Sequence, residues 1–196
     1  MPHITPRPDG RWTPLRYITA VTLTAIMAGF ASPALAQDDR QTDVTVGYLN
    51  VMGSMHGTTI QVSRQLTARG TVVGEFDASR GPDPGEDDST YTDFAALIGM
   101  RQQWRWGTRF TPFWQLLGGG LFSNGEGRTC SCGQAVSVTY LAVQPGVGIT
   151  AMMTPRLGIR AQADVQIAGS TDAYLQGTSI FPRTTVGAVI RLGRTR

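Results

Sequence analysis

The residue best suited to acid–base chemistry in this chain is His56, which lies two positions after Ser54 in residues 53–58. An imidazole can take the proton of a serine hydroxyl, and a carboxylate such as Asp87 or Asp88 would complete a set for acyl transfer or acyl hydrolysis. That chemistry requires the imidazole within hydrogen-bond reach of the nucleophile. No motif around these residues fixes such an arrangement. We therefore expect His56 to be a solvated loop residue and assign no catalytic residues.

A second candidate is the acidic run at residues 83–88, which holds four carboxylates among six residues. Carboxylate oxygens bind Ca²⁺ and Mg²⁺, but the spacing here is not that of an EF-hand loop. We expect a solvated loop that at most bridges divalent cations to nearby phosphate groups. The run predicts no dedicated metal site and no cofactor.

The two cysteines, Cys130 and Cys132, form a Cys-x-Cys pair in a loop rich in glycine and serine. In an oxidising compartment a small, strained disulfide is the favoured interpretation. A metal site would require more ligands, and neither histidine nor a further cysteine lies close in the sequence. A redox role ranks third.

The elements that carry these residues are defined by an alternation of apolar and polar side chains between Val138 and Ile167. The turn at residues 154–156 divides this segment into two arms, and the second face of each arm is small, amide-bearing or charged. The apolar face comprises Thr139, Leu141, Val143, Val147 and Ile149, followed by Leu157, Ile159, Ala161, Ala163, Val165 and Ile167. Period-two alternation over about ten residues predicts strands that cross a bilayer.

The same alternation predicts eight strands in the whole chain, with connections of alternating length. The strands are expected at residues 43–51, 59–68, 71–79, 92–102, 109–122, 136–152, 157–168 and 183–192. Short turns alternate with longer segments rich in Gly, Asp, Ser and Pro, as in outer-membrane barrels with periplasmic turns and external loops. Only the first external loop, at residues 53–58, is short. The sequence therefore predicts an all-β fold, an eight-stranded antiparallel up-and-down transmembrane β-barrel.

If the apolar face points outward, the other face predicts a lumen lined by charges of both signs. The set is nearly balanced and comprises Asp43, Glu75, Asp77, Asp93 and Asp164 with Arg101, Arg109, Arg160 and Arg191. Buried charges must be paired, so this balance predicts a filled lumen with at most a small ionic leak. Arg64 falls on the apolar face, where we expect it to snorkel or to mark a bulge.

Aromatic residues gather near the predicted strand ends, as they do in the two interfacial girdles of membrane barrels. The expected periplasmic girdle comprises Trp104, Trp106, Phe110 and Trp114, and the external one Phe76, Tyr91, Phe122 and Phe181.

The N-terminus predicts secretion. Three arginines precede an apolar run at residues 18–30, and an Ala-Leu-Ala cleavage site follows at residues 34–36. We expect residues 1–36 to be a cleaved signal peptide and residues 37–196 to be the barrel domain. Cleavage removes three of the 17 arginines and one of the 14 acidic residues, which leaves 14 against 13 and no reason to expect nucleic-acid binding.

The rival architecture is a soluble, lipocalin-like barrel that binds a lipid, with its apolar face turned inward. Such a barrel needs charged residues along the exterior of every strand. The predicted strand at residues 136–152 contains no charge at all. The membrane barrel is therefore the favoured architecture.

Three segments of the chain resemble the small outer-membrane β-barrel family, the OmpA- and OmpX-like eight-stranded domains. Residues 111–120 (TPFWQLLGGG) are similar to a family strand that ends in glycines, residues 144–160 to a Gly-x-Gly hairpin with an inward arginine, and residues 185–192 to the last strand. The resemblance extends over the expected mature chain. It implies the outer membrane of a Gram-negative cell, delivery by the barrel-assembly machinery, and contact with outer-membrane lipid and lipopolysaccharide.

The resemblance leaves two functions open. Most simply, the chain is a non-enzymatic barrel with a structural or surface-interaction role. Some relatives instead modify lipid A through His-Ser-acid sets, which would make His56 the essential residue. No catalytic motif of those relatives matches here, so the first function is the expected one.

Overall fold

The computed structural model describes residues 41–82, 90–104, 106, 109–126, 136–170 and 178–193. Among these residues, none forms a helix long and apolar enough to cross a membrane. The expected signal peptide, residues 1–36, lies outside the described residues, so its cleavage stays a prediction.

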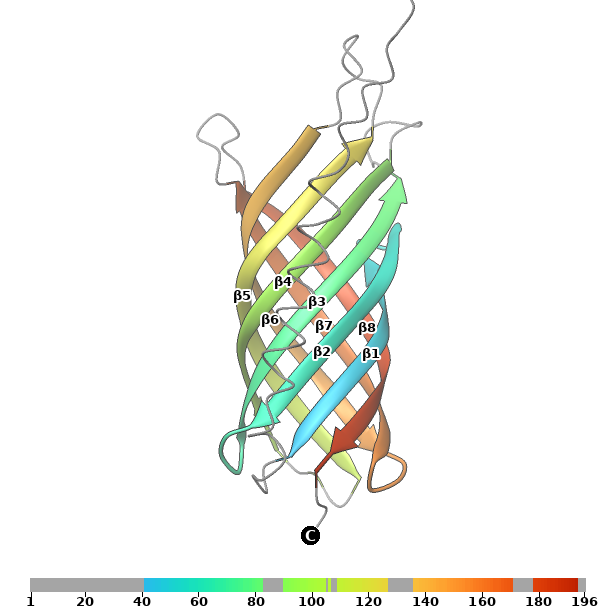
Figure 1. The fold of residues 1–196 in the computed structure, drawn as a ribbon, viewed down its shortest axis with the longest axis vertical. Coiled ribbons are helices and arrows are strands. Elements are labelled where there is room, and N and C mark those ends of the chain that lie inside the picture. The colour runs from blue at the N-terminus through green and yellow to red at the C-terminus, as the bar shows by residue number, and fades with distance from the viewer. Residues whose placement is uncertain are drawn as a thin grey trace, which may run out of the picture. The chain divides into compact units, whose positions relative to one another are not determined.

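Eight antiparallel strands close into a single barrel in which each strand pairs with its neighbours in the sequence and β8 pairs with β1 (Figure 1). The strands are β1 (Thr42–Val51), β2 (Met55–Gln65), β3 (Gly70–Pro82), β4 (Thr90–Gln103), β5 (Phe110–Glu126), β6 (Val136–Met152), β7 (Leu157–Ser170) and β8 (Thr178–Leu192). We call the end at which β1 begins and β8 finishes the turn end, and the opposite end the loop end. The predicted up-and-down barrel is confirmed.

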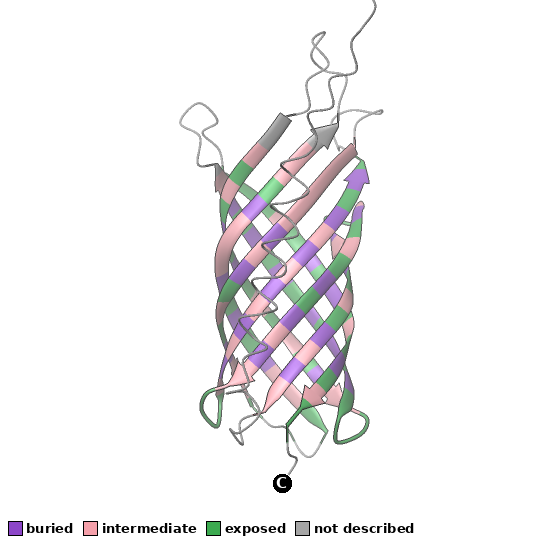
Figure 2. Ribbon diagram, in the orientation of Figure 1, coloured by how far each residue is buried: buried purple, intermediate pink, exposed green. Residues whose placement is uncertain are grey.

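The wall of the barrel follows from the alternation in the sequence. Buried residues alternate along each strand with exposed or half-buried ones, as the stripes in Figure 2 show. On β6, Val143 is 50% exposed whereas the next residue, Gln144, is fully buried. Apolar side chains thus cover the outside of the barrel and polar ones fill its inside, as period-two alternation requires for a strand between lipid and a closed lumen.

Several strand boundaries differ from the prediction, among them the starts of β2 and β8, which lie in segments expected to be loops. The expected loop at residues 53–58 is only a turn, because β2 begins at Met55, and the turn places Met52 and Gly53 at positive φ. Strand β8 begins at Thr178, five residues earlier than predicted. Glycine, serine and proline suggested loops in both segments, but pairing with β1 and β7 overrides these local preferences.

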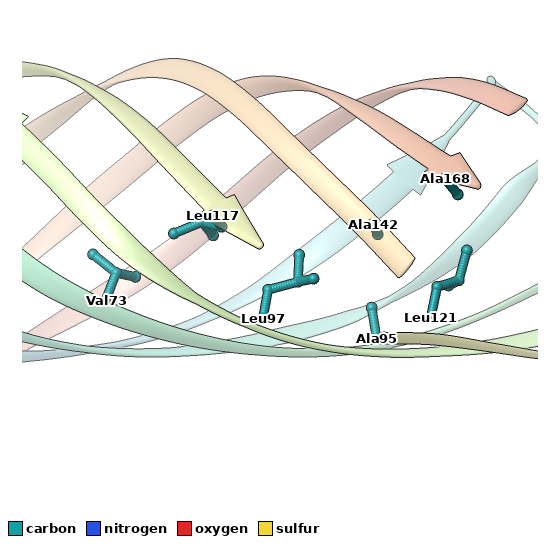
Figure 3. Close-up of a cluster of buried hydrophobic side chains, with 7 residues drawn as sticks. All are labelled: Val73, Ala95, Leu97, Leu117, Leu121, Ala142 and Ala168. Atoms are coloured by element: carbon teal, nitrogen blue, oxygen red, sulfur yellow. The ribbon is translucent and has the colours of Figure 1, made fainter. Parts of the chain in front are cut away.

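The interior also holds apolar side chains among the polar ones. A cluster of seven buried side chains runs from β3 to β7 and is drawn in Figure 3: Val73, Ala95, Leu97, Leu117, Leu121, Ala142 and Ala168. A smaller cluster of Leu49, Val51 and Met55 lies at the β1–β2 turn. Phe181 packs against both clusters and so joins them. Apolar side chains therefore help to fill the lumen.

The aromatic girdles differ from the prediction in two residues. Trp104, Trp106, Phe110 and Trp114 are all exposed near the turn end, and Phe122 is exposed toward the loop end. Phe181 and Tyr91, however, pack against the internal clusters rather than facing outward. Their positions on the inward-facing alternation of β8 and β4 explain the error, since nearness to a strand end does not decide which face a side chain takes.

Candidate functional site

The polar part of the lumen is organised around Gln61, whose side chain is 1% exposed. Its Oε1 accepts hydrogen bonds from the guanidinium NH2 of Arg101 (2.7 Å) and NH1 of Arg160 (3.2 Å). Its Nε2 donates to Oε2 of Glu75 (2.5 Å) and Oε1 of Gln162 (3.1 Å). One amide on β2 thereby connects two buried cations with a buried anion.

Arg183 of β8 provides the closest ion pairs of the lumen. Its NH2 lies 2.6 Å from Oδ2 of Asp77 and 3.3 Å from Oε1 of Glu75, and its NH1 donates to Oε1 of Gln144. Gln144 in turn donates from Nε2 to the same Glu75 oxygen at 2.8 Å. The two carboxylates of β3 therefore share one guanidinium from β8, which ties β8 to β3 across the lumen.

Near the turn end, Asp43 of β1 is the shared anion. Its Oδ1 lies 3.2 Å from Nε of Arg191, and its Oδ2 lies 4.0 Å from NH2 of Arg160. Arg160 also donates to the hydroxyls of Thr45 (2.9 Å) and Thr150 (3.0 Å). These contacts close the ring of strands at β1, because its partners come from β7 and β8.

Asp164 of β7 is held by amides. Gln162 donates to its Oδ2 at 2.7 Å and Gln115 to its Oδ1 at 3.4 Å. Gly146, opposite on β6, leaves room for this carboxylate, which a β-carbon at that position would overlap.

Arg101 stacks over Phe113, with 4.2 Å between the guanidinium carbon and the ring centroid, in addition to its bonds with Gln115. An arginine over an aromatic face gains a cation–π attraction that is stronger away from water. The buried guanidinium is thus held by a ring on one side and amide oxygens on the other.

A small cavity lies among the described side chains of the lumen. Its volume is about 10 Å³, and it is lined by Asp77, Gln166, Phe181 and Arg183, among others. That volume corresponds to about one water molecule. The described part of the lumen is therefore filled by its own side chains, as an eight-stranded barrel allows.

Solved outer-membrane barrels share this architecture. Neisserial surface protein A aligns with a TM-score of 0.57 and 8% identity over 80% of this chain and 98% of that one. Ail of Yersinia pestis gives 0.55 and 14% over 79% and 100%, and a major outer membrane protein of Thermus thermophilus gives 0.57 and 11% over 79% and 100%. The chain has the fold of the small outer-membrane β-barrels. No protein-family model and no curated protein matches the sequence.

Within this fold, the structure brings most of the predicted charged residues into the lumen. Six are buried (Asp43, Glu75, Asp77, Arg101, Arg160 and Asp164), and Arg191 is partly buried against Asp43. Asp93 is half-buried and accepts a 2.6 Å hydrogen bond from the hydroxyl of Ser123, apart from the arginines.

Arg109 was predicted wrongly. It is exposed in the β4–β5 turn because β5 begins one residue later, at Phe110. A side chain outside the strand takes no part in the inward and outward alternation, and water is available at the turn end. Cys130, Cys132 and residues 83–89 lie outside the described residues, so the disulfide stays a prediction.

Arg183 and the glutamines Gln61 and Gln115 were not among the predicted lumen residues. Arg183 lies eight residues before Arg191 on one strand, an even separation that places both on the same face. The glutamines share the inward alternation of their strands as well, but a search confined to charges passes over them. Alternation applied to every polar side chain would have found all of them.

His56 lies in β2 rather than in a loop, with its ring on the outside of the barrel. Its Nδ1 is hydrogen bonded to the Tyr48 hydroxyl and lies 3.1 Å from Nδ2 of Asn50, and its ring stacks on Tyr48 with 5.9 Å between centroids. Ser54 is not among its described partners, and Asp87 and Asp88 lie outside the described residues. The described part of the chain also holds no group of three or more metal-ligating side chains.

Proposed function

We propose that the protein is a non-enzymatic outer-membrane barrel with a structural or surface-interaction role, whose lumen is closed. The observation that carries this proposal is the chain of contacts from Asp43 to Asp77, which fills the lumen and ties β1, β2 and β3 to β7 and β8. A barrel that conducts solutes would not place interlocked side chains across its own channel. Function then resides in the surfaces that the barrel presents.

The proposed setting is the outer membrane of a Gram-negative cell. Residues 1–36 are cleaved during export, the barrel-assembly machinery inserts the mature chain, and the turn end faces the periplasm. The exposed apolar belt, which includes Val143 (50% exposed) and Leu141 (68% exposed), supports contact with membrane lipid rather than with water. The outer leaflet of that membrane would surround the loop end with lipopolysaccharide.

A surface-interaction role is compatible with this fold. Ail, one of the barrels that aligns with the chain, was also solved in complex with the heparin analogue sucrose octasulfate. This complex supports the presence of a binding surface on a barrel of this fold. In the present chain we place that role at the loop end.

The test is to express the full chain in a Gram-negative host, fractionate the membranes, and compare boiled with unboiled samples on a detergent gel. The proposal predicts outer-membrane location and heat-dependent migration. Purified protein in planar bilayers should show no stable channel openings. A soluble periplasmic product, or large uniform channels, would contradict it.

The enzymatic alternative is tested separately. Lipid A from cells that express the chain should have the same mass spectrum as lipid A from cells that express His56→Ala. A mass change that depends on His56 would replace the proposed function with acyl transfer or hydrolysis.

A further inference from the structure

The outside of the barrel carries a groove of about 850 Å³ that crosses β1, β8, β7, β6 and β5. Its outer walls are two rows of outward side chains on paired strands, and its floor reaches the inward residues Gln115, Asp164 and Arg183 beside Gly146. One row comprises Asn50, Thr184, Ala163, Val147 and Trp114, and the other Met52, Pro182, Val165 and Pro145. The groove has the volume of a ligand site, about 300–1,000 Å³.

The groove slopes through the membrane-facing wall from the loop end toward the turn end. It starts at Asn50, one residue before the end of β1, and finishes at Trp114, four residues after the start of β5 at the turn end. Strands lie about 4.8 Å apart, so the five strands give it a length of about 19 Å. The hydrocarbon core of a bilayer is about 30 Å thick, so one leaflet of it is shorter than the groove. The groove can therefore hold an acyl chain that is extended across one leaflet.

A backbone carbonyl in this groove lacks its ladder donor. The β6–β7 pairing is interrupted between Val143↔Ile167 and Gly146↔Asp164, where Pro145 lies opposite Val165. The Pro182 carbonyl accepts from the Met52 amide on β1, so Val165, opposite Pro182, must direct its own backbone groups away from β8 and toward Pro145. Proline has no N–H, which leaves the Val165 carbonyl available to a hydroxyl or amide donor from a ligand.

At the end nearer the loop end of the barrel, the groove continues into a row of polar residues on the same outer face. Thr184, Asn50, His56 and Arg80 lie on adjacent strands at paired positions, and His56 and Arg80 are both exposed. The Asn50 amide and the Tyr48 hydroxyl both lie against Nδ1 of His56, so Nδ1 acts as the acceptor and Nε2 carries the ring proton. A guanidinium beside an imidazole N–H forms a suitable pair of donors for a phosphate group.

We infer that the groove and the polar row together bind one molecule of a phosphorylated, hydroxyacylated glycolipid of the lipid A type. An acyl chain occupies the groove, a chain hydroxyl donates to the Val165 carbonyl, and a phosphate contacts Arg80 and His56. This inference rests on the proposed function, since it requires the loop end to face the outer leaflet. It gives the surface role a defined ligand and a defined place.

The test uses the full chain inserted in outer membranes, extracted in mild detergent and analysed by native mass spectrometry, followed by titration in nanodiscs with lipid A or with phosphatidylglycerol. Ala163→Trp fills the groove, and Ala161→Trp is its matched control on the same strand and face, outside the groove. Arg80→Gln removes the cation of the polar row, and Arg64→Gln removes an outward arginine near the turn end. Pro145→Val restores the missing N–H.

The wild type, Ala161→Trp and Arg64→Gln should retain lipid A and prefer it to phosphatidylglycerol. Ala163→Trp and Arg80→Gln should each weaken lipid A binding by about tenfold, the factor expected for loss of one good contact. Pro145→Val should lower the preference for lipid A over phosphatidylglycerol, while some binding of each lipid remains.

Equal binding by Ala163→Trp and Ala161→Trp overturns the inference, as does a wild type without preference for lipid A. A dimer that Ala163→Trp disrupts, with lipid binding unchanged, would assign the groove to a second copy of the chain instead. Heat-dependent migration is measured for every variant. A chain that fails to form the barrel contradicts the proposed function, whereas a correctly inserted barrel without lipid preference contradicts only this site.

Discussion

The inner and outer faces of the strands differ in the interactions that their side chains make. Inside the barrel, Gln61, Glu75, Arg101 and Arg183 have specific partners at hydrogen-bond distance. Outside, residues such as Leu141 and Val143 show large exposed fractions and need only to be apolar. The inner face is therefore specified residue by residue, because each buried polar group must find its partner, while the outer face is specified by composition.

This difference decides how each face responds to substitution. A lipid-facing position away from the groove accepts any apolar side chain. The stability cost of a substitution there depends on whether it introduces a charge and on the depth of that charge in the membrane. An inner position depends on which partner loses its contact. The largest effects are accordingly expected where a buried ion pair is broken, and smaller ones where a single amide is lost.

The strongest test of the inner face is Arg183→Leu. This substitution leaves Asp77 and Glu75 without their closest cation, so we expect the free energy of unfolding in detergent micelles to fall by about 3–5 kcal/mol. Urea titration followed by tryptophan fluorescence measures the change. The double variant Arg183→Leu with Asp77→Leu should regain part of the loss. If the single variant were as stable as the wild type, Arg183 would not neutralise the two carboxylates.

On the outer face, Val143→Arg tests the membrane itself. Val143 is 50% exposed and lies near the middle of β6, so the charge would meet the bilayer centre and should cost about 2–4 kcal/mol. Thr139→Arg, on the same face but closer to the loop end, should cost only about 0–1 kcal/mol. Refolding into lipid vesicles of one composition compares the two. Equal costs at both positions would mean that depth in a membrane does not control this face.

The sequence predicted which face of the barrel a side chain takes better than it predicted the hydrogen-bond partners of that side chain. Alternation alone places Val143 outside and Gln144 inside, because a pleated strand has only two faces. It does not say that Gln144 meets Glu75 and Arg183, since those contacts cross the lumen between strands distant in the chain. Such pairs depend on the closure of the barrel and on the register of all eight strands.

The same limit explains the errors in particular residues. Arg109 was assigned to the lumen because the start of β5 was placed one residue too early. Phe181 was assigned to the outer girdle because it lies near a predicted strand end, although it shares the inward alternation of β8. Strand ends are where local sequence says least, since turn-forming residues such as Pro182 also occur within long strands. Residues that lie within both the predicted and the observed strands, such as Arg101 and Arg160, were placed on the correct face.

Gln61→Leu is a smaller test of the inner face, at its most connected amide. The substitution removes an acceptor from Arg101 and Arg160 and a donor from Glu75 without changing any charge, so we expect a loss of about 1–3 kcal/mol. Gln65→Leu, at the half-buried turn end of the same strand, serves as the control and should change stability little. Chemical denaturation of both variants in the same micelles measures the difference. A larger loss in the control would show that Gln61 does not organise the polar lumen.

The smallest effect is expected at Arg109, and it sharpens the comparison between the strand and its end. Arg109 and Arg101 have the same side chain and lie on either side of one turn, but Arg101 is 1% exposed whereas Arg109 is exposed to solvent. Arg109→Gln should change the free energy of unfolding by no more than about 0.5 kcal/mol, as is usual for surface positions. Arg101→Gln should cost several times as much, because it leaves Gln61 and Gln115 without their shared donor. Parallel urea titrations of the two variants distinguish a lumen residue from a turn residue. Equal losses of stability would mean that the side chain of Arg109 lies in the lumen.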